Sequence, residues 1–482
     1  MVFLNSVKKG DVIMKKTKII CSIGPASCNP DVMEKMVNAG MNVARINCSH
    51  ATTEEKVGVV ASVKEVNKRT NKHVGILYDT KGPEFRSGMM ENDEIKLEDG
   101  KTVRLVKETV LGTSERFSVN HPQAIDNLEV GSTVLLENGL MKIEVVSVEE
   151  DGVTCKIING GLLGNKKSLN APGIKLDIPF ISEVDREDLI YACNHDADYV
   201  ALSFVNTKED VLEARAIFKE QNREDIIVIS KIESATGVEN LEEIIEVSDG
   251  IMVARGDLGV EVPMESLPIY QKMMVQKCRE NGKFCIVATE MLESMKKSAR
   301  PTRAEVSDVA NAVLDGTDAV MLSGETTIGK FPVEVVSFMA SICKNSEKFY
   351  DYDYEFESNR KNDITETIAR SVVATAHTLE VKAIIAATMS GYSARKISNL
   401  KPNSLIIATC PSEDVARKLA LNWGVYASIV PVYNSTDEVV EGAKSEAAKL
   451  INLKKGDNIV VTGGFPNNTE VKTTNFMKIE EM

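Results

Sequence analysis

The chain has 482 residues, of which 43% are hydrophobic and 27% are charged. This composition is typical of ordinary globular proteins and excludes disordered, collagen-like and membrane-spanning classes. A single hydrophobic core rarely extends beyond about 300 residues, so we expect several domains. Its 57 Lys and Arg residues against 71 Asp and Glu residues leave a net charge of -14, which repels a nucleic-acid backbone. We therefore expect a small-molecule partner, and an anionic substrate would need locally placed cations or metal ions.

The cysteines and the first residues bear on the cellular compartment. Nine cysteines are scattered along the chain without a C-x-x-C pair, a pattern that fits a reducing cytoplasm and not a disulfide framework or a zinc site. The amino-terminal segment MVFLNSVKKGDVIM has only a short apolar start before two lysines and an aspartate. It is not typical of a secretory signal, and no run of 18 apolar residues occurs elsewhere.

Eight short apolar segments alternate with stretches of helix length. Continuous apolar runs indicate strands that are buried on both faces, and the intervening stretches Glu209–Gln221 and Glu265–Asn281 are long enough for crossover helices. Eight βα units are the count of a TIM barrel, although a doubly wound sheet could use the same units. The predicted strands are Lys18–Cys21, Asn42–Ile46, Val74–Tyr78, Tyr199–Leu202, Ile226–Ile229, Gly250–Val253, Cys285–Ala288 and Ala319–Leu322.

The interval between the third and fourth strands exceeds a hundred residues and predicts an inserted β domain over residues 87–170. Its expected strands are Thr102–Val106, Ser132–Leu136, Met141–Val148 and Val153–Ile158. Asn138-Gly139 and Asp151-Gly152 are predicted to form hairpin turns of type I′, in which both positions need positive φ.

The carboxyl-terminal part again alternates helix and strand. We expect helices at Ile364–Leu379, Ala394–Leu400, Ser412–Asn422 and Asp437–Leu450, and strands at Ala383–Ala387, Ser404–Ala408, Ser428–Val432 and Asn458–Val461. The acidic, tyrosine-rich stretch Tyr350–Asn362 is the predicted linker. The domains are thus expected at 15–86 with 171–349, at 87–170 and at 350–482, after an extension over 1–14.

Polar groups follow nearly every predicted barrel strand. In a TIM barrel the catalytic groups project from the carboxyl ends of the strands, so their convergence there predicts an active site. Any one of them alone is better explained as a solvated residue at the start of a loop. The segments are Arg45–His50, Asp79–Lys81, Ser203, Ser230–Glu233, Arg255–Asp257, Thr289-Glu290 and Ser323–Glu325.

The residue types at these ends suggest phosphoryl chemistry. Lys231 and Glu233 are two apart on a strand and can face the same way, and Asp257 could complete an oxygen site. Two carboxylates with water and substrate oxygens suit Mg²⁺ or Mn²⁺ better than Ca²⁺. Arg45 and Lys231 add two cations, which suit a migrating phosphoryl group. A G-x-x-x-x-G-K-[ST] loop is absent from the sequence, so ATP chemistry would not use that nucleotide loop.

Seven long motifs extend these observations to a known family. They are KTKIICSIGPAS (16–27), MNVARINCSH (41–50), DTKGPEFR (79–86), SKIESATGVENL (230–241), ARGDLGVEVP (254–263), ATEMLESM (288–295) and RPTRAEVSDVANAVLDGTDAVMLSGETTIGKFP (300–332). The chain resembles the pyruvate kinase family from about Lys15 to Glu480. The resemblance implies an α/β protein: a (β/α)8 TIM barrel, an inserted β-barrel-like lid domain and a carboxyl-terminal α/β domain for regulation and oligomerisation.

The resemblance also implies a reaction and the residues that carry it. The family transfers the phosphoryl group of phosphoenolpyruvate to ADP, giving ATP and pyruvate, the final step of glycolysis. Lys231 would stabilise the transferring group, Arg45 would contact the phosphate, and Thr289 would hold the substrate carboxylate and deliver a proton. Further positions matched by the motifs are Gly256 and Asp257 for the carboxylate, Glu233 and Asp257 for Mg²⁺ or Mn²⁺, and Asn47, Ser49, Asp79 and Thr80 for K⁺. Glu84 matches the carboxylate that accompanies potassium dependence.

Nucleotide and effector positions are implied in the same way. His50, Arg86 and Asn47 match the ADP contacts, together with Lys166 or Lys167 from the insert. Thr388, Ser390, Gly391 and Ser393 resemble a loop that grips a sugar-phosphate effector, although a plain strand-to-helix turn explains them equally well. The family is usually a cytoplasmic homotetramer.

Two other function classes fit part of this pattern. A TIM-barrel Mg²⁺ aldolase acting on pyruvate would need the metal and a carboxylate pocket, but it gives no reason for the insert or Lys231. A non-catalytic paralogue would be marked by loss of Lys231, Asp257 or Thr289, and all three are present.

Overall fold

The structure is a computed structural model that describes residues 14–174, 176–352, 363–464 and 473–482. The predicted extension before Met14 and most of the predicted linker, residues 353–362, lie outside the described residues. The chain divides into two compact units. The first unit contains the described residues up to Tyr78, the short segment His195–Tyr199 and the residues from Val275 onward. The second unit contains Asp79–Asn194 and Val200–Met274.

Eight parallel strands form a closed barrel in the order β1-β16-β15-β14-β13-β12-β3-β2. The strands are β1 (Lys18–Ser22), β2 (Val43–Asn47), β3 (Gly75–Asp79), β12 (Tyr199–Leu202), β13 (Ile227–Ile232), β14 (Gly250–Ala254), β15 (Phe284–Ala288) and β16 (Ala319–Leu322). All eight predicted strands are confirmed, and the barrel resolves the alternative of a doubly wound sheet. β13 extends three residues beyond its predicted end, because Ser230 and Lys231 interrupt the apolar run without ending the strand.

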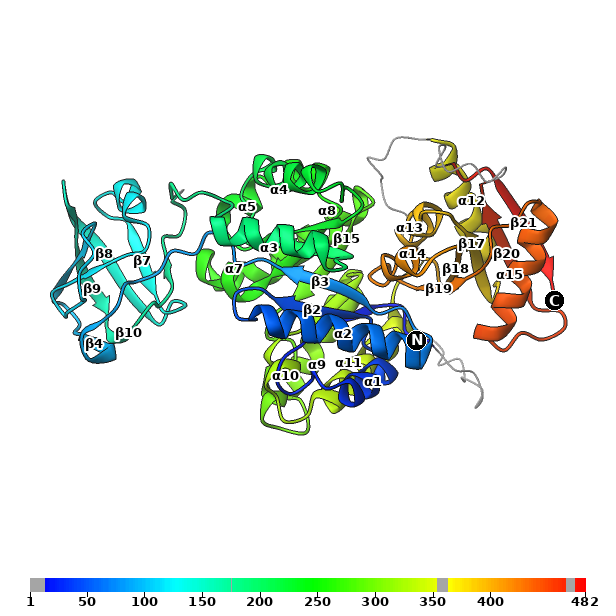
Figure 1. The fold of residues 1–482 in the computed structure, drawn as a ribbon, viewed down its shortest axis with the longest axis horizontal. Coiled ribbons are helices and arrows are strands. Elements are labelled where there is room, and N and C mark those ends of the chain that lie inside the picture. The colour runs from blue at the N-terminus through cyan, green and yellow to red at the C-terminus, as the bar shows by residue number, and fades with distance from the viewer. Residues whose placement is uncertain (1–13, 175, 353–362, 465–472) are drawn as a thin grey trace. The chain divides into compact units, whose positions relative to one another are not determined.

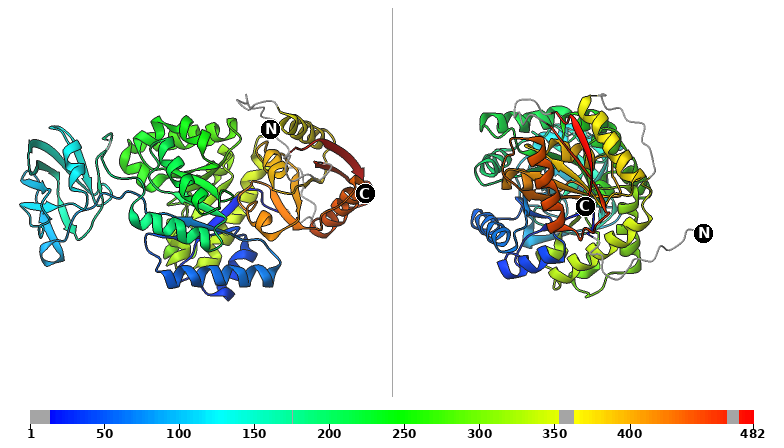
Figure 2. Two further views of the ribbon diagram at one scale, coloured as in Figure 1. Left: turned by 45° about the horizontal axis from the view of Figure 1, so that its top comes forward. Right: turned by 90° about the vertical axis from the view of Figure 1, so that its right-hand side faces the viewer.

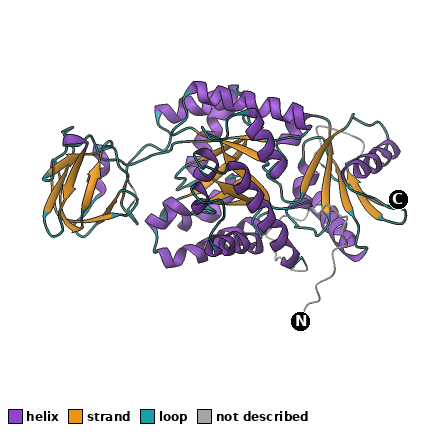
Figure 3. Cartoon of the chain, turned by 90° about the horizontal axis from the view of Figure 1, so that it is seen from below, coloured by secondary structure: helices purple, strands orange, loops and turns teal. Residues whose placement is uncertain are grey.

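Helices follow the barrel strands and surround them (Figure 3). They are α1 (Pro30–Ala39), α2 (Thr53–Thr70), α3 (Glu183–Asn194), α4 (Lys208–Glu220), α5 (Ala235–Glu239), α6 (Leu241–Val247), α7 (Arg255–Glu261), α8 (Leu267–Glu280), α9 (Arg303–Asp315), α10 (Gly324–Thr327) and α11 (Pro332–Ser346). Short 3₁₀ turns are η3 (Met264–Ser266), η4 (Glu293–Lys296) and η5 (Glu347–Phe349). Capping boxes at Thr52 and Thr302 satisfy amide groups at the starts of α2 and α9. Among the described helices, none is long and apolar enough to cross a membrane.

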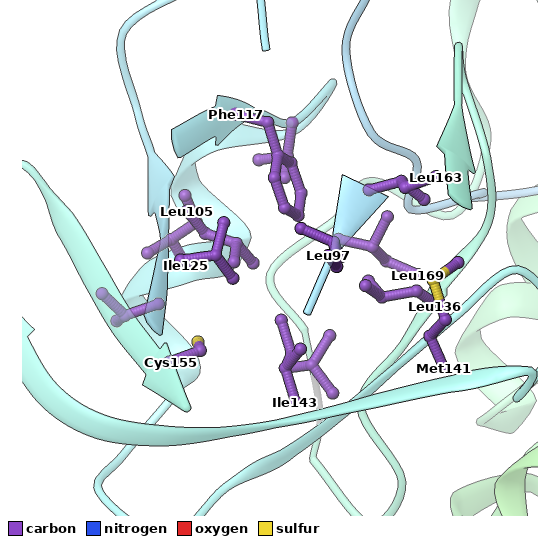
Figure 4. Packing of buried hydrophobic residues seen from close by; sticks show 14 of the residues in the cluster. Leu97, Leu105, Phe117, Ile125, Leu136, Met141, Ile143, Cys155, Leu163 and Leu169 are labelled. Atoms are coloured by element: carbon purple, nitrogen blue, oxygen red, sulfur yellow. The ribbon is translucent and has the colours of Figure 1, made fainter. Parts of the chain in front are cut away.

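The insert forms a curled six-stranded sheet in the order β11-β7-β8-β9-β5-β6, with a separate two-stranded sheet β10-β4. These strands and turns are η1 (Glu91–Asp93), β4 (Glu94–Leu97), β5 (Thr102–Val106), β6 (Arg116–Ser118), η2 (Pro122–Asn127), β7 (Thr133–Leu136), β8 (Met141–Glu149), β9 (Gly152–Asn159), β10 (Gly161–Gly164) and β11 (Leu169–Asn170). Alternating side chains from several strands, among them Leu105, Leu136 and Ile143, meet in one core together with Phe117 (Figure 4).

The two predicted hairpin turns of the insert have different outcomes. Asn138 and Gly139 have φ of 56° and 83°, as a type I′ turn requires. β8 and β9 do form the second hairpin, with Glu149 opposite Gly152. Asp151 and Gly152 do not have positive φ, so the type I′ geometry predicted for them is wrong. Gly152 instead belongs to β9, where a Cβ would lie 2.2 Å from the carbonyl oxygen of Leu105. Close approach of a neighbouring strand, and not turn geometry, therefore explains this glycine.

The carboxyl-terminal part is a five-stranded sheet in the order β19-β18-β17-β20-β21, with helices on both faces (Figures 1 and 2). Its elements are α12 (Ile364–Thr378), β17 (Ala383–Ala387), α13 (Tyr392–Ser398), β18 (Leu405–Cys410), α14 (Glu413–Arg417), β19 (Val425–Ile429), α15 (Thr436–Leu450), β20 (Asn458–Gly463) and β21 (Phe476–Glu481). Residues of α12 and α13 pack on one face, and residues of α15 pack on the other. The alternation predicted from sequence is confirmed, but β19 begins three residues before its predicted start at Ser428, and α14 ends five residues before its predicted end at Asn422. The antiparallel edge strand β21 was not predicted.

All nine cysteines are free thiols, as the absence of paired spacing predicts. The predicted domain boundaries at 86/87, 170/171 and 349/350 stay predictions.

Candidate active site

Lys231 lies at the centre of a buried polar cluster at the carboxyl ends of β3, β12 and β13. Its ε-ammonium group is 2.7 Å from Ser203 Oγ and 3.1 Å from Asp79 Oδ1. It also lies 3.1 Å from Glu233 Oε1, so the two residues predicted to share a face do so. The Asp79, Ser203 and Glu233 side chains are almost completely buried. The lysine charge is therefore held in one place by partners from three strand ends.

Glu233 is almost completely buried in this cluster. Its Oε2 accepts a hydrogen bond of 2.7 Å from the backbone amide of Phe204. Burial raises the pKa of Glu233 to about 7, and the charges of Asp257 and Asp79 add to the rise, while Lys231 opposes it. A carboxyl group with such a pKa is one whose charge lacks full compensation from the protein.

The charge balance of the cluster is suited to a cation. The carboxylates of Asp79 and Asp257 both act on Glu233, and Lys231 is the cation that opposes them there. Across the described ranges, no group of three or more His, Cys, Asp or Glu side chains is arranged to hold a metal. Glu233 and Asp257 would thus supply two carboxylates, leaving the remaining positions to water and substrate oxygens. That donor set fits Mg²⁺, which keeps several non-protein ligands.

Strained backbone marks the same ends of the barrel strands. Phe204, Thr289 and Glu290 have φ of 55°, 68° and 53°, values that are uncommon for residues other than glycine and a genuine outlier for β-branched Thr289. Phe204, in this conformation, donates its backbone amide hydrogen bond to Glu233. The Thr289 hydroxyl donates to the carbonyl of Ala288 over 2.6 Å. Such strain persists where the surrounding structure enforces it, typically at active sites.

Ser203 fixes the segment that leaves β3. Its backbone amide donates to Thr80 Oγ1 over 3.1 Å, and its hydroxyl donates to the Thr80 carbonyl over 2.7 Å. Gly82 has φ of 75°, and a Cβ there would lie 2.7 Å from Ser203 Cβ. The Gly82 amide donates to Asp185 Oδ1 over 3.0 Å. The predicted cation residues Asp79 and Thr80 therefore belong to a segment with little freedom.

The residues that follow form a second polar group. Arg86 makes a bidentate pair with Glu84, with distances of 2.8 and 2.7 Å. Although burial acts in the opposite direction, the Arg86 hydrogen bond lowers the pKa of Glu84. Arg86 also donates to the Lys166 carbonyl over 2.8 Å, while the Lys167 ammonium lies 2.5 Å from Glu137. The side chain of Lys166 is exposed, so the two lysines differ in their surroundings.

Gly256 and Asp257 lie in the first turn of α7, directly after β14. Amide groups in the first turn of a helix are not bonded within the helix and carry partial positive charge. They lie directly after a barrel strand, and their predicted role in binding a carboxylate stays a prediction.

A cavity of about 870 Å³ lies in the unit that contains the residues up to Tyr78 and from Val275 onward. Its wall includes Arg45, Asn47 and His50. The Arg45 guanidinium donates to Ser22 Oγ over 2.7 Å, which fixes it beside the end of β1. Asn47 Oδ1 accepts from the amide of Ser49 over 3.2 Å. The rest of the wall comes from β1, α2 and the turn after β16, with Ile23, Val59 and Ile328 as apolar members.

The loop predicted to bind an effector lies between β17 and α13. Gly391 has φ of 80° and forms the amino-terminal cap of α13. Thr388 and Ser393 are buried, and the Ser393 hydroxyl lies 2.6 Å from that of Thr474. Ser390 receives a 3.0 Å hydrogen bond from Arg395 on its carbonyl. The loop is thus tied into its own domain.

Sequence reasoning missed two roles in this site. Ser203 was placed at a strand end without a function, because a lone serine carries no motif. Asp185 was not considered, although the spacing Ser182-x-x-Asp185 is that of a helix cap, and Ser182 does accept from the Asp185 amide over 3.1 Å.

Comparison with known proteins gives a consistent result. The family described as pyruvate kinase, barrel domain, matches residues 14–336, and the one described as pyruvate kinase, alpha/beta domain, matches residues 366–480. The chain is 46% identical to the pyruvate kinase of Staphylococcus haemolyticus, over 97% of this chain and 80% of that protein. It is 44% identical to that of Geobacillus stearothermophilus, over 96% and 80%. A solved structure of a pyruvate kinase from Cryptosporidium parvum superimposes with a TM-score of 0.93, at 38% identity over 99% of this chain and 98% of that one.

Proposed function

The chain belongs to the pyruvate kinase family and is a phosphotransferase, and from this premise we propose which residues carry the transfer from phosphoenolpyruvate to ADP. The observation that carries the proposal is Lys231 among buried carboxylates. A fixed ammonium group beside a divalent cation is the arrangement that stabilises the equatorial oxygens of a transferring phosphoryl group.

Glu233 and Asp257 would hold the Mg²⁺ ion. When bound, the ion neutralises charge on the phosphoryl and enolate oxygens. The buried position of Glu233 and its bond to Phe204 fix the direction of one carboxylate. Because the raised pKa of Glu233 reflects burial and neighbouring negative charge, a bound cation would favour its ionised form.

The substrate would be oriented by groups from several strand ends. Amides at Gly256 and Asp257, with the Thr289 hydroxyl, would bind the carboxylate, and Arg45 would bind the phosphate. Thr289 would also take part in protonation of the enolate. The parallel strands of one closed barrel carry all of these residues at their carboxyl ends, which supports their joint use.

The nucleotide would use the cavity beside Arg45, whose wall includes Asn47 and His50. Arg86 and one of Lys166 and Lys167 would contact the phosphates. Separate replacement of each lysine by methionine should raise KM for ADP for one of them only. The inserted domain, residues 87–170, would exclude water from the transfer as a lid.

Asn47, Ser49, Asp79 and Thr80 would bind K⁺, with Glu84 as the accompanying carboxylate. We expect turnover in K⁺ to exceed turnover in a tetraalkylammonium salt by about tenfold or more, which corresponds to about 1.4 kcal/mol. Equal turnover in the two salts would refute this assignment.

An effector site at Thr388, Ser390, Gly391 and Ser393, a homotetrameric assembly and a cytoplasmic location complete the proposal. A sugar-phosphate activation curve that is unchanged in Tyr392→Ala would favour a structural role for the loop.

The reaction itself is tested by initial rates. Phosphoenolpyruvate and ADP with Mg²⁺ and K⁺ should yield ATP and pyruvate, and rates with candidate phosphorylated effectors would define regulation. Absence of ATP formation under these conditions would refute the proposed reaction.

A further inference from the structure

The Ser203 hydroxyl lies between two parts of the site that the proposed function treats separately. On one side it is 2.7 Å from the ammonium group of Lys231, and on the other it is 2.7 Å from the carbonyl oxygen of Thr80. The side chain is buried. One hydroxyl therefore contacts both the residue assigned to the phosphoryl group and a residue assigned to the monovalent cation.

The directions of these hydrogen bonds follow from the chemistry of the groups. A lysine ammonium group can only donate, so Ser203 Oγ accepts from Lys231. The hydroxyl has one proton, and the Thr80 carbonyl at 2.7 Å is a closer acceptor than Asp79 Oδ1 at 3.3 Å. The chain of bonds thus runs from Lys231 through Ser203 to the carbonyl of Thr80. Bonds in such a chain strengthen one another in a buried environment.

Backbone contacts around Ser203 hold this series of hydrogen bonds in place. The Ser203 amide donates to Thr80 Oγ1, so Thr80 is held through both its side chain and its carbonyl. Gly82 packs on Ser203 so closely that a Cβ would lie 3.0 Å from the Ser203 carbonyl oxygen. A shift of the Thr80 carbonyl would therefore move Ser203, and with it an acceptor of Lys231.

We propose that Ser203 is a positioning residue that couples the cation segment at Thr80 to the placement of the Lys231 ammonium group. The proposal rests on the assignments of Lys231 and Thr80 made above. A cation bound by the segment of Asp79 and Thr80 would fix the position of the Thr80 carbonyl, and the Ser203 hydroxyl that donates to this carbonyl would transmit the change to Lys231. Without the hydroxyl, Lys231 keeps Asp79 and Glu233 as acceptors and is drawn toward them.

The test compares Ser203→Ala with a matched buried serine. Ser230 directly precedes Lys231, is fully buried and shares a 2.7 Å hydrogen bond with Ser248, away from the lysine. Ser230→Ala therefore removes a buried hydroxyl hydrogen bond on the strand of Lys231, but it leaves the hydrogen bonds between Lys231, Ser203 and Thr80 intact. Both variants are made in the full chain, and thermal unfolding establishes that each is folded.

Initial rates are measured at saturating phosphoenolpyruvate, ADP and Mg²⁺, once in a K⁺ salt and once in a tetramethylammonium salt of the same concentration. We expect Ser203→Ala to lower kcat in K⁺ by about 10- to 100-fold, since misplacement of a group by about 1 Å can have that effect. The ratio of rates in K⁺ and tetramethylammonium should fall toward one, with KM for ADP nearly unchanged. Ser230→Ala should keep both the rate and the ratio within about twofold of the parent, because its hydrogen bond lies outside the chain of bonds.

An unchanged cation ratio in Ser203→Ala overturns the coupling, whatever happens to kcat. If Ser203→Ala does not fold, Ser203→Cys keeps a group of similar shape with a weak donor and acceptor, and the same change in ratio should appear in smaller measure. The parent enzyme is assayed first. Absence of ATP formation there counts against the proposed reaction, and an absent K⁺ response counts against the cation assignment, so these failures are distinguished from failure of the coupling.

Discussion

Buried lysines occur at both ends of the barrel strands, and their partners differ. At the carboxyl ends, Lys231 faces the carboxylates of Asp79 and Glu233, with Asp257 adding negative charge. At the amino ends, Lys18 is the first residue of β1, and Lys401 contacts Asp318, which directly precedes β16. Both are buried even more completely than Lys231. Lys18 donates to the carbonyl of Val425 and lies 4.2 Å from the centre of the Tyr426 ring.

Lys401 pairs with a single carboxylate, that of Asp318. Asp318 in turn accepts from the amide of Cys285 over 2.8 Å, which ties β15 to the start of β16. Burial lowers the pKa of Lys401 to about 8, against the attraction of Asp318. The lysines at the amino ends are thus balanced by neutral groups or by one acid each. Lys231 instead lies among several acids, and this is the difference that we expect between a site that receives a cation and a contact that holds the fold together.

The largest effect is expected from Lys231→Met. Removal of the charge that we propose stabilises the transferring group should lower kcat by at least about 10² to 10³-fold. The variant should fold, and its thermal midpoint should depend more strongly on Mg²⁺ than that of the parent, because the carboxylates lose their protein cation. The rate of ATP formation and thermal unfolding with and without Mg²⁺ are measured. A nearly normal rate of ATP formation in the variant would refute the proposed role of Lys231.

Lys401→Met should affect stability instead of catalysis. It leaves Asp318 buried without its cation, which is expected to destabilise the fold by about 3 to 5 kcal/mol. The double variant Lys401→Met/Asp318→Asn, which keeps an acceptor for Cys285, should recover part of the loss. Denaturation measures the first effect, and kcat below the unfolding transition should stay within about twofold of the parent. A large loss of kcat with unchanged stability would contradict the comparison.

The pH dependence of stability should identify the same pair. Because the pKa of Lys401 is about 8 when folded and 10.5 in its ordinary state, the unfolded chain binds more protons between these values. The cost of burying the charged lysine is fully present below pH 8 and is relieved as the pH rises, by up to about 1.4 kcal/mol per pH unit. The stability advantage of the parent over Lys401→Met should therefore grow between pH 8 and 9.5 in thermal unfolding. A shrinking advantage would show that the sign is wrong.

The smallest effect is expected from Glu290→Gln. The exposed Glu290 adds negative charge at the carboxyl end of β15, next to Thr289. An exposed charge contributes about 0.2 to 1 kcal/mol, so KM for phosphoenolpyruvate should fall by up to about fivefold at low salt. The effect should disappear at about 1 M salt, where screening is nearly complete. Glu413→Gln in α14 is the matched exposed control, and an equal change of KM there would indicate a general charge effect.

The barrel could be predicted from the sequence because each of its strands is buried on both faces and reads as an apolar run. The strands β4, β6, β10, β11 and β21 were not predicted, since they are short, contain glycine or lie at an edge, where pairing depends on distant residues. In the site, Lys231 and Glu233 were found from their spacing on one strand. The contact of Ser203 with Thr80 was not, because it joins residues 123 positions apart and a lone serine carries no motif.

The paired ends of the inserted domain have a consequence for engineering. Arg86 bridges Ser168 in antiparallel fashion, and the Leu169 amide donates to the Phe85 carbonyl over 2.8 Å. The chain therefore enters and leaves the insert side by side, and the insert encloses a core of its own. We expect that the insert can be removed and that the two cut ends of the barrel can be joined by a short linker. Residues 85–171 should fold when expressed alone, and the remaining barrel should close across the gap.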